Sequence, residues 1–120
     1  MSESNHKKEV DELRTEIKQI KKDREIIENE LRKIQENGER LYFQLQGNKT
    51  EMNRMAEQYG KKDGKLMRIL EEKSIRLRKA ISVQEEIVHM TAKKRKEVRR
   101  YSEEKQDELA KKIRRLESEK

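Results

Sequence analysis

The sequence predicts an all-α protein: a long antiparallel two-helix hairpin of the coiled-coil type. The chain has 120 residues and no proline, 48% of its residues are charged and only 30% are hydrophobic, so a thick globular core is not expected. Apolar residues recur at alternating spacings of three and four through the first half, as in helices that pack on helices. A glycine-flanked segment at 60–64 then separates two stretches of similar length. Residues 1–120 are therefore expected to form a single helical hairpin.

The first arm is predicted to be a helix over about 5–59. With Val10 placed at position a of a heptad, the apolar a and d positions form a helix-packing seam. Arg24 lies in this seam and is expected to extend its charged head to solvent. Gly38 and Asn48 also occupy seam positions, and the count continues after them, so both are predicted to lie within one helix; a restart at Asn48, with Glu51 completing a capping box, is the alternative. The seam consists of Val10, Leu13, Ile17, Ile20, Ile27, Leu31, Ile34, Leu41, Leu45, Met52, Met55 and Tyr59.

The turn is predicted at 60–64. Gly60 is a candidate for the glycine that follows a helix, Asp63 is a candidate N-cap, and Gly64 completes the segment. The second arm is then expected over about 65–118, nearly equal in length to the first arm. Equal arms about a short turn favour chain reversal over one continuous helix.

The second arm carries more apolar surface than one helix can cover. Leu66 and Leu70 belong to one stripe, whereas Leu109, Ile113 and Leu116 belong to a stripe that drifts around the helix. The uncovered part predicts a helical protein partner, with a hetero-oligomer favoured over a homodimer. The partner-facing candidates are Leu77, Ile81, Val88, Val98 and Tyr101.

A basic run in the second arm is the strongest charged feature of the chain, whose net charge is +7. The run consists of Lys93, Lys94, Arg95, Lys96, Arg99 and Arg100. Such a run can bind phosphates or act as a localisation signal. Its charges point to all sides of a helix, however, and Tyr101 is the nearest aromatic ring. A solvated segment, or one that docks on an acidic partner, is favoured; a basic coiled coil that binds nucleic acid and a homodimeric scaffold are the alternatives.

The residues needed for catalysis or metal binding are not gathered in the sequence. The chain has no cysteine, and its two histidines, His6 and His89, lie far apart. Glu85 precedes His89 by four residues, a pair expected by chance on a charged helix. The sequence therefore predicts no enzyme activity, no cofactor and no metal. Neither a Sec-type signal nor an apolar run long enough for a membrane span is recognised, which predicts a cytoplasmic protein, with export together with a partner and without a Sec signal as the alternative.

The size, the hairpin and the aromatic–glycine pair Tyr59-Gly60 at the turn resemble the small WXG-type proteins of the Gram-positive type VII secretion system. The chain is most similar to the accessory proteins that accompany LXG-domain toxins. In that family the turn motif is Trp-x-Gly, whereas here Tyr59 directly precedes Gly60. An aromatic residue followed four residues later by an acid, the spacing of the family's export signal, occurs here as Tyr59 and Asp63 in the turn instead of in a C-terminal tail. The resemblance implies a chaperone-like subunit that binds the toxin's helical N-terminal domain, with the partner carrying the export signal.

Overall fold

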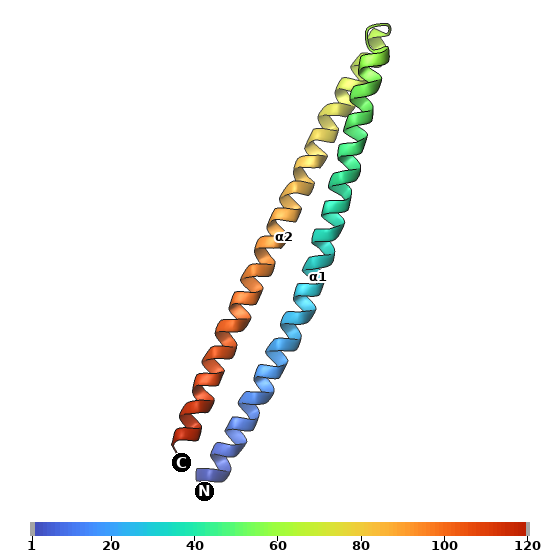
Figure 1. The fold of residues 1–120 in the computed structure, drawn as a ribbon. Coiled ribbons are helices and arrows are strands. Elements are labelled where there is room, and N and C mark those ends of the chain that lie inside the picture. The colour runs from blue at the N-terminus through green and yellow to red at the C-terminus, as the bar shows by residue number, and fades with distance from the viewer. Residues whose placement is uncertain (1, 120) are drawn as a thin grey trace. The chain divides into compact units, whose positions relative to one another are not determined.

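The computed structural model describes residues 2–119, with side chains from residue 5 onward, and consists of two helices. Helix α1 spans Ser2–Tyr59 and helix α2 spans Gly64–Ser118. They form an antiparallel hairpin, which confirms the predicted fold class (Figure 1). α1 continues without interruption through Gly38 and Asn48, so the alternative of a restart at Asn48 is wrong.

The hairpin divides into two compact units. Unit 1 combines α1 up to Arg32 with α2 from Lys93 onward, and unit 2 comprises residues 33–92, including the turn. Each unit contains one segment of each helix, so α1 and α2 pack against each other in both.

Unit 1 has a small apolar core and several ion pairs between its helices. Val10 of α1 and Leu109 and Ile113 of α2 are its buried apolar side chains. The exposed Arg14 of α1 donates a hydrogen bond to Glu117 of α2, with 2.9 Å between Nη2 and Oε1. Such exposed pairs contribute only tenths of a kcal/mol each. Apolar contact therefore supplies most of the stability at this end of the unit.

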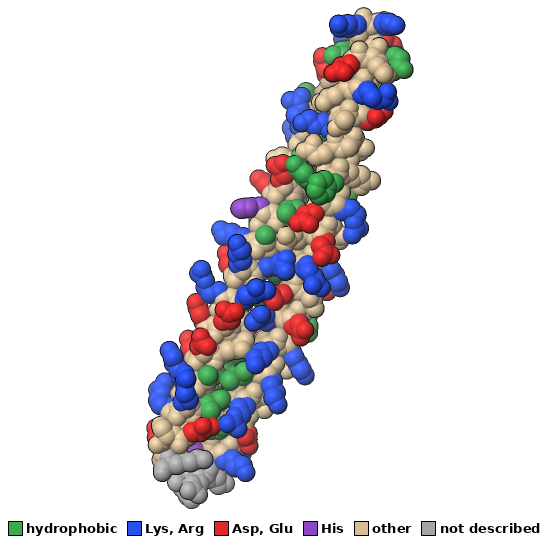
Figure 2. Space-filling model, viewed as in Figure 1, with side chains coloured by type: hydrophobic (Ala, Val, Ile, Leu, Met, Phe, Trp, Pro, Cys, Tyr) green, Lys and Arg blue, Asp and Glu red, His purple; other side chains and the backbone are tan. Residues whose placement is uncertain are grey.

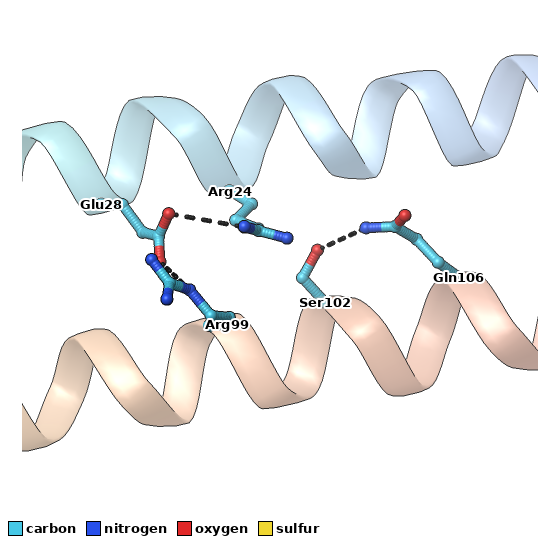
Figure 3. Close-up of polar contacts among 5 residues, drawn as sticks. All are labelled: Arg24, Glu28, Arg99, Ser102 and Gln106. Carbon is cyan, nitrogen blue, oxygen red and sulfur yellow. Dashed lines mark hydrogen bonds and ion pairs between the residues drawn. The ribbon is translucent and has the colours of Figure 1, made fainter.

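A polar layer replaces the apolar seam further along unit 1 (Figure 3). Glu28 of α1 accepts hydrogen bonds from Arg24 Nε at 3.4 Å and from Arg99 Nε of α2 at 3.1 Å. Beside them, Ser102 of α2 is only 3% exposed and accepts a hydrogen bond from Gln106 Nε2 at 3.0 Å. Each polar group in this layer therefore has a partner, which offsets the cost of removing it from water.

The polar layer coincides with a change in the inner face of both helices. Before it, the residues of α1 that face inward occupy positions a and d, as predicted; from Arg24 to Lys49 they occupy a and e. Two successive steps of four residues cause the change, Ile20 to Arg24 and Arg24 to Glu28. The same two steps occur in α2 at Val98, Ser102 and Gln106. Extra steps of this kind locally unwind a coiled coil.

The predicted seam is consequently only partly buried. Val10 is buried, and Leu13, Ile17, Ile20, Leu31, Leu45, Met52 and Met55 are half-buried. Ile27, Ile34 and Leu41 at position d, and Tyr59 at the end of α1, are instead between 44% and 52% exposed. The prediction that these four residues pack inside the hairpin is wrong. Ile27, Ile34 and Leu41 are exposed because the inner face has moved from position d to position e, whereas Tyr59 is exposed as the last residue of α1.

Gly38 allows the two helices of unit 2 to approach closely. It is buried, and a Cβ at this position would lie 2.9 Å from Val88 Cγ2 and 3.6 Å from Ile87 Cγ2 of α2. Leu70 and Ile81 of α2 are the buried apolar side chains of this unit. A glycine inside a helix costs about 1 kcal/mol in helix propensity, and here the close contact with Val88 offsets that cost.

The turn between the helices depends on Gly60, where a side chain has no space, and on Asp63, whose side chain caps the start of α2. A Cβ on Gly60 would lie 2.5 Å from the carbonyl oxygen of Ala56 and 2.6 Å from Met67 Sδ, so a side chain does not fit. None of the described residues has a positive φ, so Gly60 is required for space and not for a left-handed conformation. Asp63 Oδ1 accepts hydrogen bonds from the backbone N–H groups of Lys65 and Leu66, and it thereby caps α2.

Candidate protein-binding surfaces

One side of unit 2 carries an apolar surface that the hairpin leaves open. A shallow groove on this side is lined by Asn48 and Met55 of α1 and by Arg76 and Ala80 of α2. Residues seven positions apart on a helix lie on nearly the same side of it and form what we call a row. The apolar residues that lie in the rows of these four groove residues are Ile34, Leu41, Val83, Ile87 and Met90, and we call them the open face.

The open face consists of large side chains in solvent. Ile34, Leu41, Val83 and Met90 are between 44% and 66% exposed, and Ile87 is half-buried beside Gly38. Charged side chains are scattered along the face shown in the space-filling view, and hydrophobic side chains appear there in separate groups (Figure 2). On such a polar chain, apolar side chains aligned on one side are the expected mark of an interaction site.

Basic residues border the open face on α2. Lys73 lies on the row of Ile87, Arg76 lies on the row of Val83 and Met90, and Lys79 lies on the next row outward. Arg40 occupies the corresponding outer row of α1. The acidic residues are Glu51, which lines the same groove and pairs with Arg54, and Glu72 and Glu86, which share the row of Lys79. This border favours a ligand whose apolar stripe is flanked by acidic side chains.

The other side of unit 2 carries an aromatic groove. It is lined by Glu39, Tyr42, Phe43, Glu85, Val88, His89 and Ala92. Phe43 is 72% exposed, and its ring lies edge-on to Tyr42 with centroids 5.7 Å apart. The hydroxyl of Tyr42 accepts a hydrogen bond from Gln46 Nε2 at 3.1 Å. This groove is not among the predicted sites, although the adjacent aromatic residues Tyr42 and Phe43 are a signal of it in the sequence.

The five partner-facing candidates do not lie together on one surface. Ile81 is buried, whereas Leu77, Val88 and Val98 are half-buried. Val88 lies against Gly38 of α1, and Leu77 lines a groove with Met52 and Met55. Tyr101, in contrast, is 66% exposed in unit 1. The two apolar stripes expected on α2 are a single inner face that turns at Ser102.

The basic run in unit 1 is partly compensated within the chain. Lys94 pairs with Glu97 at 3.6 Å, and Arg99 hydrogen-bonds to Glu28. Arg95 is half-buried, whereas Lys93, Lys96 and Arg100 are exposed. Lys93, Lys96 and Arg100 are spaced three and four residues apart and share one helix face, while the ion pairs of Lys94 and Arg99 reduce the positive charge beside them.

Groups that could support catalysis remain dispersed. His6 approaches Glu119 at 3.9 Å in unit 1, whereas His89 lies in the aromatic groove of unit 2. Among the described residues, no three His, Cys, Asp or Glu side chains are arranged to hold a metal ion. The hydrogen bond from Arg54 lowers the pKa of the Glu51 carboxyl group, although this pair is exposed on α1. Neither described helix is long and apolar enough to cross a membrane.

The fold defines a helical hairpin protein, and its exposed apolar side chains form candidate binding surfaces on two sides of unit 2. Comparison of the chain with protein-family models, curated proteins and solved structures finds no match.

Proposed function

We propose that this protein is a non-catalytic helical binding subunit, and that its open face packs against an amphipathic helix of another protein. The observation that carries the proposal is the exposure of Ile34 and Leu41, seven residues apart on α1, and of Val83 and Met90, seven residues apart on α2. Two helix rows with this spacing form a channel into which the side chains of a third helix can insert. Covering the exposed half of each side chain contributes about 1 kcal/mol.

The charges around the open face specify the partner further. Lys73, Arg76 and Lys79 border the face on α2, so the partner helix is expected to carry acidic residues beside its apolar stripe. Exposed ion pairs of this kind mainly set association rate and orientation. The apolar side chains supply most of the affinity.

The resemblance to accessory proteins of type VII secretion suggests a particular class of partner. On that basis we propose that the partner helix belongs to the helical N-terminal domain of an LXG toxin. The protein would act as a chaperone-like subunit in the cytoplasm, and it would remain with the toxin until export. The toxin, and not this chain, would carry the export signal.

The proposal is tested with substitutions that place charge on the open face. The Leu41→Glu/Val83→Glu double variant and the control Ile75→Glu each replace exposed apolar residues of unit 2, but Ile75 lies outside the open face. Proteins retained from lysate of the native cell are identified by mass spectrometry after a nuclease wash. The helical domain of the retained partner is then purified and titrated by calorimetry with each variant.

We expect the wild-type protein and Ile75→Glu to bind the partner domain equally, and the double variant to bind at least a hundredfold more weakly. Equal binding by all three proteins would refute the assignment of the open face. The oligomeric state of the wild-type protein and of the double variant, measured by analytical ultracentrifugation, provides a second check. A wild-type homodimer that the double variant dissociates would mean that a second copy covers this face, which would also contradict the proposal.

A further inference from the structure

We infer that the aromatic groove of unit 2 is a second binding site and that it accepts an arginine side chain from a partner protein. The groove lies on the side of unit 2 that carries Phe43, and the rows of the open face do not contribute to it. The inference therefore rests on this groove alone and is independent of the proposed function.

The aromatic rings supply one half of the site. Phe43 is the most exposed of the large apolar side chains in the part of the chain that the structure describes. Its neighbour Tyr42 meets it at an angle of 77°, and Gln46 holds the Tyr42 hydroxyl. An aromatic ring supported in this way presents a π surface to solvent. A guanidinium group binds such a surface through cation–π contact and planar stacking.

Two carboxylates supply the other half. Glu39 lies one helical turn before Phe43, and Glu85 lies one turn before His89, so an acidic side chain from each helix lines the same groove. Glu39 accepts a hydrogen bond from Gln35 Nε2 at 3.3 Å. Because this amide donor is neutral, it does not neutralise the negative charge of Glu39. A guanidinium group can donate to carboxylates while it stacks on a ring, whereas a lysine ammonium group offers no planar surface.

The charge of the site distinguishes it from the rest of the molecule. The chain has a net charge of +7, yet the aromatic groove is lined by two carboxylates and by no Lys or Arg side chain. A cationic ligand is therefore attracted to this groove. Unit 2 would thus distinguish two partner segments, one apolar with acidic flanks and one that presents arginine.

The inference is tested by NMR titration of the full chain with a capped, alanine-based helical peptide that carries two arginines four residues apart. Matched peptides carry lysine or glutamine in place of both arginines. Chemical-shift changes are followed at the backbone amides of Phe43 and His89. We expect the arginine peptide to bind, the lysine peptide to bind severalfold more weakly, and the glutamine peptide not to bind.

Variants of the chain identify the groups responsible. Phe43→Ala is expected to weaken binding of the arginine peptide about two- to fivefold. The double variant Glu39→Gln/Glu85→Gln is expected to weaken it by a similar factor, and the single variant Glu85→Gln by a smaller one. Glu57→Gln, an exposed residue of α1 outside the groove, is the charge-matched control for the Glu85→Gln single variant. Phe43 is largely exposed, so its replacement should leave the helical circular dichroism spectrum unchanged.

Three results would overturn the inference. The first is the absence of shift changes at Phe43 and His89 at millimolar arginine peptide. The second is equal weakening by Glu85→Gln and Glu57→Gln, which would indicate attraction to the overall charge alone. The third is undiminished binding by Phe43→Ala, which would remove the ring from the site.

Discussion

Arg99 of α2 donates a hydrogen bond to Glu28 of α1, with 3.1 Å between Nε and Oε1 (Figure 3). The Glu28 side chain is only 15% exposed and also accepts a hydrogen bond from Arg24. One carboxylate thus holds two guanidinium groups, one from its own helix and one from the opposite helix. This arrangement links the two helices at the polar layer of unit 1.

Replacing Glu28 should destabilise the hairpin more than replacing an exposed neighbour. We expect Glu28→Gln to lower the free energy of unfolding by about 1–3 kcal/mol, because the half-buried Arg24 loses its charged partner. Glu25→Gln, at an exposed position of the same helix, should change it by less than about 0.5 kcal/mol. Urea unfolding followed by circular dichroism measures both. Equal effects of the two substitutions would show that Glu28 acts only through net charge.

Two glycines of α1 should respond oppositely to the same substitution. Gly47→Ala is expected to stabilise the protein by about 0.5–1 kcal/mol, because its Cβ would meet nothing within 4 Å and alanine favours helix. Gly38→Ala should destabilise it, because its Cβ would lie 2.9 Å from the stiff Val88 side chain, and overpacking costs about 1–3 kcal/mol. Thermal and urea unfolding test the pair. Stabilisation by both substitutions would rule out the close approach at Gly38.

Ile81 and Val83, two residues apart on α2, are expected to have different roles: Ile81 stabilises the fold, and Val83 contributes to partner binding. Ile81 is 7% exposed, so Ile81→Ala should cost about 2 kcal/mol or more in unfolding free energy. Val83 is 50% exposed, so Val83→Ala should change that free energy by about 0.5 kcal/mol at most while weakening partner binding. Unfolding curves and calorimetric titration with the partner domain measure the two effects. A large loss of stability in Val83→Ala would contradict its place on the open face.

Nucleic-acid binding should be weak and should disappear near physiological salt. Glu97 and Glu28 compensate part of the basic run, so few phosphate contacts are available to it. A surface making about 6–10 such contacts would lose several decades of affinity as salt rises to about 0.2 M. Fluorescence anisotropy with labelled single and double strands over a salt series measures this. Sub-micromolar affinity at about 0.15 M salt would instead support the nucleic-acid alternative.

The fold class could be predicted from the sequence because apolar spacing and turn composition act locally. The part of the inner face that moves from position d to position e, between Arg24 and Lys49 of α1, could not be predicted. The change from position d to position e occurs where Arg24 and Glu28 face inward, and polar residues give no hydrophobic signal of burial. Ile27, Ile34 and Leu41 were consequently assigned to the seam, although they lie beside it. Their exposure is visible only once α2 is placed against α1, through contacts such as that between Arg99 and Glu28.

The candidate surfaces were harder to predict for the same reason. The apolar residues of a binding surface are those that remain exposed after the two helices pack together. Their identity therefore depends on which side of each helix faces the other helix. Ile81 and Val83 lie two residues apart in an apolar part of α2, and the sequence alone does not show which of them is buried. The exclusion of a side chain at Gly60 likewise depends on the folded geometry, because it comes from the carbonyl oxygen of Ala56 at the end of α1.

The turn at Gly60 also determines how the two helices find each other. Because 60–63 tether the end of α1 to the start of α2, pairing within unit 2 is intramolecular and does not depend on protein concentration. Cleavage after the exposed Lys61 or Lys62 would convert it into a bimolecular association between two peptides. The cleaved halves would then reassemble only above a threshold concentration, which makes this loop a natural place to divide the protein into a complementing pair.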